Sequence, residues 1–156
     1  MLFRSGTCWT EVNDLNAAKY NSSTLGTSTA CISVGGSGPT ASNEEWNGTC
    51  WSEEADLNDA RQSLAGQATG IGTTTAAIVT AGNPPAPATV SVQTESYDGT
   101  TWTSVADLAT ARSNSMAAGI QTSGMISGGN ISGTPHTNAT ELWDGAPQAV
   151  QTVTTS

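Results

Sequence analysis

The fold of this chain is decided by three copies of one stretch: Trp9-Thr10-Glu11-Val12-Asn13-Asp14-Leu15, Trp51-Ser52-Glu53-Glu54-Ala55-Asp56-Leu57 and Trp102-Thr103-Ser104-Val105-Ala106-Asp107-Leu108. Each copy begins with Trp and a hydroxyl residue and ends with Asp-Leu. Five residues after each Asp comes a cation, which is Lys19, Arg61 or Arg112. A fixed internal period is the signature of a repeat architecture. We therefore interpret the chain as one structural unit written three times.

Two further anchors recur in each copy. A run of small and apolar residues ends in a glycine pair, and an acid followed by an aromatic residue comes after a loop of variable length. The pairs are Gly35-Gly36, Ala81-Gly82 and Gly128-Gly129, and the acid–aromatic segments are Glu44-Glu45-Trp46, Glu95-Ser96-Tyr97 and Glu141-Leu142-Trp143. Every variable loop contains proline, which marks these loops as surface connections.

A tight turn is predicted between each aromatic residue and the Trp that follows it. The turns contain Asn47-Gly48 and Asp98-Gly99, dipeptides that supply the positive φ angles of a two-residue hairpin turn. The flanking segments are rich in Thr, Val and aromatic residues, as β-strands prefer. Trp143-Asp144-Gly145 repeats the turn near the C-terminus, although Gln148 stands where the Trp would be.

No stretch of ten or more residues keeps a helical period, so we expect an all-β fold. Each unit is predicted to contain four short antiparallel strands: one after the cation, one ending at the glycine pair, one ending at the aromatic residue and one starting at Trp. Four strands in about 40–50 residues is the pattern of a β-propeller blade. We interpret residues 1–156 as a single propeller-type domain, with a remnant hairpin at 1–15 and units at 16–57, 58–108 and 109–156.

Composition narrows the range of partners. Four cations and thirteen acids give a net charge of -9, without the Lys and Arg clusters that bind phosphate groups. We therefore expect no nucleic-acid partner. No apolar stretch reaches the roughly 18 residues of a membrane-spanning helix, so no membrane insertion is expected.

The three cysteines, Cys8, Cys31 and Cys50, are an odd number and cannot all pair within the chain. Cys8 and Cys50 precede Trp where the third copy has Thr101, so we predict small strand residues with free thiols.

Taken together, these anchors resemble kelch repeats: an apolar strand ending in Gly-Gly, an aromatic residue after a variable loop, a Trp shortly after it, and a downstream Arg. The chain departs from the kelch pattern in the short gap between Tyr97 and Trp102, at Ala81, and in the missing last Trp. The Gly-Thr-Trp-Thr, Asp-Leu and Thr-Ala-Ala phrases are similar to the kelch-like repeat arrays of structural proteins in tailed bacteriophages, especially those of marine cyanobacteria.

The kelch resemblance implies structural roles for the repeated residues. The glycine pairs would let neighbouring backbones approach closely. The tryptophans that open the three copies, Trp9, Trp51 and Trp102, would fill the space between adjacent blades. The three cations, Lys19, Arg61 and Arg112, would pair with acids or backbone carbonyls at the blade junctions.

The sequence identifies no catalytic, cofactor-binding or metal-ligating residue. His136 is the only histidine, and one histidine cannot build a zinc site without carboxylates or thiolates at suitable spacing. Kelch enzymes such as galactose oxidase hold copper with Tyr and His ligands, which two tyrosines and one histidine do not supply. We therefore expect a protein that is not an enzyme and carries no cofactor.

The resemblance implies a structural or adhesion module of a phage particle, located in the virion as a tail, fibre or capsid-surface component. Its partners would be further copies of itself, other virion proteins, or a host-surface glycan or protein. The alternative is a kelch protein–protein interaction scaffold, soluble in the cytoplasm or outside the cell. In that case loops such as Asn83-Pro84-Pro85-Ala86-Pro87 would present the contact surface.

About three blades are fewer than the four to eight with which propellers typically close. We expect the ring to be completed either by oligomerisation or by blades that lie in a longer or separate polypeptide. Of the two, the sequence favours two chains pairing end to end into a six-bladed ring, since the last unit extends to its final predicted strand.

Overall fold

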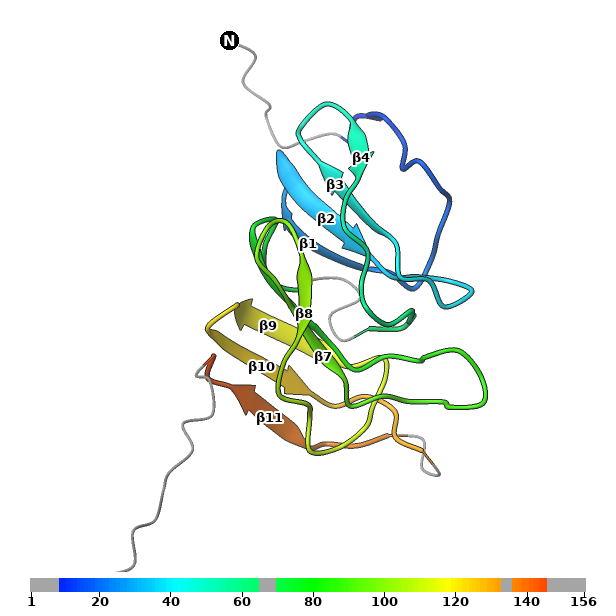
Figure 1. Ribbon diagram of the computed structural model, residues 1–156, viewed down its shortest axis with the longest axis vertical. Helices are drawn as coiled ribbons and strands as arrows, with labels where there is room; N and C mark the ends of the chain where they lie inside the picture. The colour runs from blue at the N-terminus through cyan, green and yellow to red at the C-terminus, as the bar shows by residue number, and fades with distance from the viewer. Residues whose placement is uncertain (1–8, 65–69, 133–135, 146–156) are drawn as a thin grey trace, which may run out of the picture.

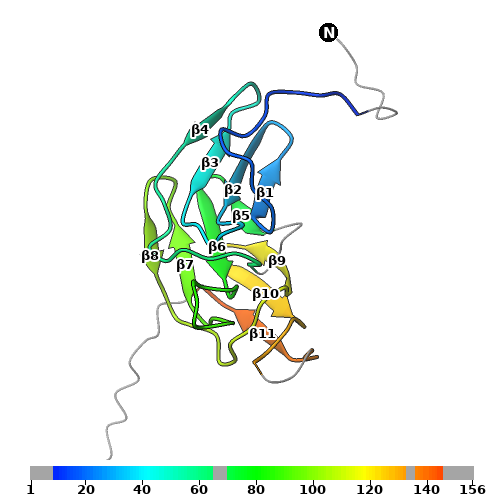
Figure 2. The ribbon, with the colours of Figure 1, turned by 90° about the vertical axis from the view of Figure 1, so that its right-hand side faces the viewer.

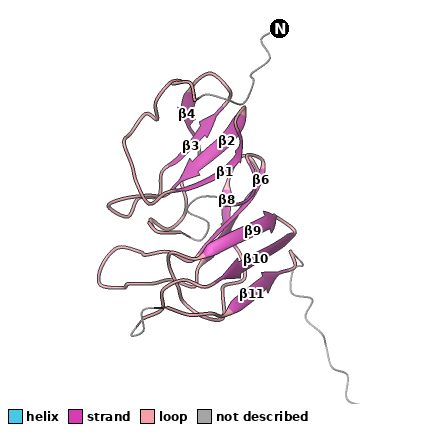
Figure 3. Ribbon diagram, turned by 180° about the vertical axis from the view of Figure 1, so that it is seen from behind, coloured by secondary structure: helices cyan, strands magenta, loops and turns pink. Residues whose placement is uncertain are grey.

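A computed structural model of the chain describes residues 9–64, 70–132 and 136–145 (Figure 1). These residues form eleven strands and no helix (Figure 3). Within the described ranges there is accordingly no helix long and apolar enough to cross a membrane. The predicted all-β fold is confirmed for this part of the chain.

The strands form three antiparallel sheets in which sequence neighbours are also sheet neighbours. The first sheet contains β1 (Ser23–Thr27), β2 (Ala30–Val34), β3 (Asn43–Trp46) and β4 (Trp51–Glu53). The second contains β5 (Ile71–Thr73), β6 (Ala76–Thr80), β7 (Thr94–Tyr97) and β8 (Trp102–Ser104). The third contains β9 (Met116–Ile120), β10 (Ser123–Ser127) and β11 (Thr140–Trp143).

The four predicted strands are therefore present in each of the first two sheets. The third sheet has three described strands, and its predicted last strand at 149–155 lies outside the described residues. The same is true of residues 1–8 of the predicted N-terminal hairpin. Its described part, residues 9–15, forms no strand.

The three sheets follow one another in chain order (Figures 1 and 2), with β1 against β5, and β5 and β6 against β9. Apolar side chains pack in both intervening spaces, although a cavity remains between the second and third sheets. Between the first and second sheets lie Leu25, Ile32, Val34, Leu57, Leu64, Ala77, Val79, Tyr97 and Trp102. Between the second and third lie Ile71, Ile78, Ala81, Ala117 and Ile126. The second sheet is thus buried on both faces.

The glycine pairs adopt backbone conformations that bring segments close together, as predicted. An added Cβ at Gly35 would lie 2.6 Å from the carbonyl oxygen of Arg61, so a side chain there has no room. Ala81, which replaces the first glycine of the second pair, takes φ 64°, the same as Gly35. The repeat therefore holds its backbone geometry even where the residue is not glycine.

The predicted hairpins are present, but their turns are built differently from the prediction. Trp46 faces Trp51 across the first hairpin and Tyr97 faces Trp102 across the second. Only the turn glycines have positive φ, 92° at Gly48 and 94° at Gly99. The expectation that Asn47 and Asp98 would also need positive φ is wrong. Their side-chain oxygens accept backbone N–H bonds from the two residues after the glycine, at 2.8–3.0 Å, so they act as turn acceptors.

The second hairpin should carry a pH-dependent part of the stability. Hydrogen bonds from the Thr100 hydroxyl and from the Thr101 and Thr100 amides lower the pKa of Asp98 from 3.8 to about 2. A carboxyl whose pKa is depressed by folding stabilises the protein above its unfolded pKa, and that contribution is lost as the pH falls through its folded pKa. Between pH 3.8 and about 2, wild type should therefore lose stability relative to Asp98→Asn, which copies Asn47 of the first hairpin.

Urea unfolding of both proteins at stepwise pH values measures this difference, and an NMR titration of the Asp98 carboxyl gives its pKa directly. A stability difference that stays constant with pH, or an Asp98 pKa at its ordinary value, would contradict the turn described above.

Candidate functional site

Each unit contains an ion pair between its cation and the glutamate of its acid–aromatic segment. The pairs are Lys19–Glu44 at 3.1 Å, Arg61–Glu95 at 2.6 Å and Arg112–Glu141. The side chains of Arg61 and Glu95 are each 1% exposed. The kelch resemblance implied that these three cations pair with acids or backbone carbonyls, and their pairing with acids is confirmed. The acids themselves were not identified from the sequence, although these glutamates recur in step with the cations, which was the available signal.

The second oxygen of each glutamate fixes the backbone just after Asp-Leu. It accepts the N–H of Asn16 at 2.8 Å, of Asn58 at 2.7 Å and of Ala109 at 2.7 Å. We call each set of cation, glutamate and bound N–H a clasp. In the second clasp Arg61 also donates to the carbonyl of Gln93 at 2.9 Å. Burial lowers the pKa of Arg61, while the Glu95 and Asp59 carboxylates oppose that shift. The repeated charged residues thus hold the fold together.

Trp102 fills the space between the first and second sheets, as predicted. It is 6% exposed, and its ring stacks on Tyr97 with centroids 4.6 Å apart. Its indole N–H donates to the carbonyl of Ala55 at 3.0 Å, in the segment that follows the first sheet. Asn58 donates to the carbonyl of Trp102 at 3.0 Å and ties the strand to the second clasp.

The tryptophans that open the other two copies differ from Trp102. Trp51 is half-buried and packs on Trp46, with ring centroids 5.5 Å apart. Trp9 is fully exposed, so the prediction that it fills a space between adjacent blades is wrong for the described structure. The reason is that no sheet precedes the first one among the described residues, and nothing is present to cover the ring.

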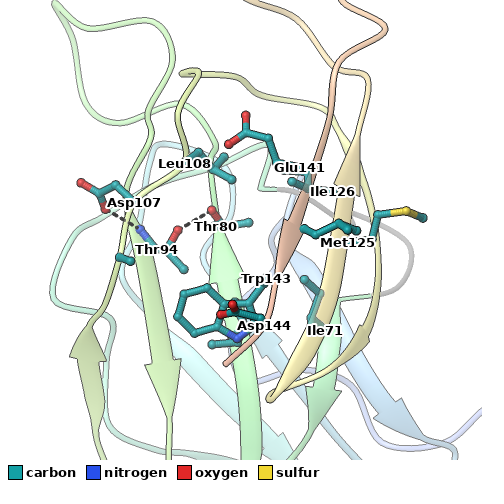
Figure 4. Close-up of a pocket in the computed structure, with 13 residues that line it drawn as sticks. Ile71, Thr80, Thr94, Asp107, Leu108, Met125, Ile126, Glu141, Trp143 and Asp144 are labelled. Atoms are coloured by element: carbon teal, nitrogen blue, oxygen red, sulfur yellow. Dashed lines mark hydrogen bonds between the residues drawn. The ribbon is translucent and has the colours of Figure 1, made fainter. Parts of the chain in front are cut away.

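The equivalent space between the second and third sheets is open (Figure 4). It is a cavity of about 250 Å³, which we call the slot. Its walls come from both sheets and from the segment after β8, and the lining residues are Ile71, Ile78, Thr80, Thr94, Ala106, Asp107, Leu108, Met125, Ile126, Glu141, Leu142, Trp143 and Asp144. Small-molecule pockets usually measure roughly 300–1,000 Å³, so the slot is on the small side for a ligand of that kind.

The slot lies where Trp102 lies in the preceding junction. Ala106 and Trp143 line it, and by the repeat they correspond to Ala55 and Tyr97, the hydrogen-bond acceptor and the stacking partner of the Trp102 ring. Residues around the slot are correspondingly more exposed than their counterparts around Trp102. The glutamate side chain of the third clasp, Glu141, is 21% exposed against 1% for Glu95, and Leu108 is half-buried where Leu57 is buried. The only sequence signal for this cavity was Gln148, which stands where the repeat would place a Trp.

The described part of the chain contains no candidate metal centre. Within it, no three His, Cys, Asp or Glu residues are grouped so that they could hold a metal ion. His136 is exposed, with its Nδ1 3.1 Å from the Asn130 side-chain oxygen. Cys31 and Cys50 are free thiols, and burial followed by the nearby Glu45 raises the pKa of Cys31. Cys50 lies in the turn before β4 and not in a strand, and Cys8 lies outside the described residues.

Comparison with known proteins shows the fold and no more. No protein-family model matches the chain. No curated protein matches it either. Among solved structures the chain is similar to one described as "Structure of YjhT", with a TM-score of 0.64 and 13% sequence identity. The match covers 80% of this chain and 41% of that one, so this chain spans less than half the length of the structure whose fold it shares.

Proposed function

We propose that the three sheets are consecutive blades of a kelch-like β-propeller. The proposal is supported by the four-stranded antiparallel order of the first two sheets, by the same order in the described strands of the third, and by the clasp that recurs in all three. Four strands per repeat is the blade pattern. About three blades per chain require completion, either by oligomerisation or by blades from another polypeptide.

The chain itself serves as a non-enzymatic structural or adhesion module of a phage particle. The observation that carries this proposal is that the repeated charged residues are committed to the clasps. Arg61 and Glu95 are each 1% exposed and bond to each other and to backbone groups, which leaves them unavailable to a substrate. Charged residues that recur in every unit in the same bonds serve the architecture. The particle context and the location in the virion are part of this proposal, and their support is the resemblance of the repeats to repeat arrays of tailed phages.

Its partners are further copies of this chain, other virion proteins, or a glycan or protein on the host surface. The net charge of -9 opposes binding to nucleic acid, since phosphate recognition depends on Lys and Arg.

The second candidate function is a protein-interaction scaffold. The observation that favours it is the loop after the second glycine pair, in which residues 85–89 are all exposed and which contains three prolines. Prolines limit the conformations open to a loop, so less entropy is lost when it binds a partner.

Mass spectrometry of purified phage particles from a culture expressing this chain separates the two functions. The particle role predicts that its peptides copurify with intact virions in a fixed ratio to the capsid protein, and that antibodies against the chain label particles in electron micrographs. Peptides found only in the soluble fraction of infected cells would contradict the particle role and favour the scaffold.

A further inference from the structure

We propose that the slot between the second and third sheets receives Trp9 from a second copy of this chain. In this arrangement, residues 9–11 of the second copy add a fourth strand to the β9–β11 sheet. The proposal depends on the blade arrangement described above and is independent of the role in a particle.

The junction between the first and second sheets shows how one sheet is joined to the next, and it serves as the template for the junction between two copies. After β4, the chain passes through Ala55 to Asn58, and Asn58 binds the second sheet at the second clasp. The N–H of Asn58 donates to Glu95 at 2.7 Å, and its side chain donates to the carbonyl of Trp102 at 3.0 Å. The strand just before that segment, β4, belongs to the preceding sheet. A segment bound in this way therefore follows the last strand of the sheet before it.

The N-terminal segment is bound to the first sheet in the same way. The N–H of Asn16 donates to Glu44 at 2.8 Å, and the Asn16 side chain donates to the carbonyl of Trp51 at 3.4 Å. By the template, the residues just before this segment, Trp9 to Glu11, should be the last strand of a preceding sheet. No such sheet is present among the described residues, and Trp9 is fully exposed.

Among the described residues, the third sheet lacks the fourth strand that the first two sheets have. Its described strands end at β11, which has no described strand on its outer side, whereas β3 and β7 are paired there with β4 and β8. A Trp at the position equivalent to Trp102 would stack on Trp143 and donate its indole N–H to the carbonyl of Ala106. Both residues line the slot, and Figure 4 labels Trp143 among the lining side chains.

The outer face of the third sheet also needs a cover. Met116, Ile120, Met125 and Leu142 are exposed by 77%, 59%, 43% and 80%. The strand register places them on the face opposite Ala117 and Ile126, and Met125 and Leu142 also border the slot. By the repeat and the strand register, Met125 corresponds to Ile32 and Ile78, which are buried beneath the next sheet. The first sheet of the second copy, which follows Trp9 in that chain, would cover this face in the same way.

One occupant thus satisfies three features of the chain: an exposed Trp, an open slot and an uncovered apolar face. Two copies joined by two identical junctions give six sheets, within the range of about four to eight blades found in closed propellers. Both copies are acidic, with a net charge of -9 each, so screening by salt should favour their association.

Sedimentation equilibrium of the full chain tests the proposal. We expect a dimer of twice the 15.8 kDa chain mass, in a fraction that rises with NaCl concentration. Trp9→Ala and Ala106→Glu should each weaken association roughly tenfold or more, because a buried Trp anchor dominates such interfaces and a charge would occupy the slot. Both positions are exposed in the single chain, so both variants should fold. Tyr20→Ala, which removes another exposed aromatic ring, is the matched control and should dimerise as wild type does.

Mixing the two variants gives the sharpest readout. Trp9→Ala keeps an intact slot and Ala106→Glu keeps an intact Trp9, so a mixture can form one complete junction. It should associate more tightly than either variant alone, which general destabilisation would not produce. A folded wild type that remains at the monomer mass across concentrations overturns the proposal, as does a dimer indifferent to both substitutions. If deletion of residues 146–156 converts a monomer into a dimer, the chain's own tail occupies the slot and the proposal is also overturned.

Discussion

Replacing Glu95 by Gln should cost about 3–5 kcal/mol of unfolding free energy, the usual result of removing one partner from a buried ion pair. Gln keeps the size of the side chain but not its charge, so the Arg61 guanidinium remains buried without its counter-ion. Both side chains are 1% exposed, which leaves little access for water to compensate. Small domains are stable by only about 5–15 kcal/mol, so this single change should lower the melting temperature sharply.

The matched control is Glu141→Gln in the third clasp. Its partner Arg112 is also buried, but Glu141 is 21% exposed, so water can replace part of the lost interaction and the cost should be smaller. Urea unfolding followed by Trp fluorescence measures both variants. Placing them in a Trp9→Ala background removes any contribution from self-association. Equal losses at the two positions would show that burial does not set the strength of the clasp.

Replacing Gly72 by Ala should destabilise the second sheet by roughly 3 kcal/mol or more. Gly72 lies in β5 with φ 106°, a conformation that L-residues rarely adopt, and strain of that kind costs about 1–3 kcal/mol. An added Cβ would also lie 2.0 Å from the carbonyl oxygen of Ala76, so the β5–β6 hairpin must open to admit it. Overpacking of this kind costs a further 1–3 kcal/mol or so.

Gly38→Ala separates the two contributions. Gly38 has φ 76°, but an added Cβ there meets nothing within 4 Å, so only the backbone strain of about 1–2 kcal/mol applies. Thermal unfolding of the two variants, in the same background, compares them directly. Similar melting temperatures would mean that the Gly72 contact relaxes without cost and that the tight hairpin is not needed for stability.

Gly72 also belongs to a repeated glycine position that was not recognised from the sequence. Gly26 and Gly119 occupy the same position in β1 and β9, and an added Cβ on either would lie within 2.4 Å of a carbonyl oxygen. Their recurrence was visible in the sequence. Its meaning depended on how closely the first two strands of each sheet turn, which is a property of the folded hairpin.

The sequence by itself determined the features that depend on residues near one another in the chain. Strand content, the hairpins at Gly48 and Gly99 and the threefold repeat all follow from local alternation, turn residues and constant spacing. The recurrence of the cations at one position of every unit was likewise visible in the sequence, while their pairing with acids or backbone carbonyls was expected from the kelch resemblance. These features need no information about neighbouring sheets.

Only the tertiary structure decided the features that depend on what lies beside each unit. It paired Arg61 with Glu95, 34 residues away, and it gave two copies of one motif opposite environments, with Trp102 buried and Trp9 exposed. It also left a slot between the second and third sheets, whereas the space between the first and second sheets is filled. The physical reason is that burial belongs to a pair of adjacent sheets, so an identical side chain is covered only where a neighbouring sheet is present to cover it.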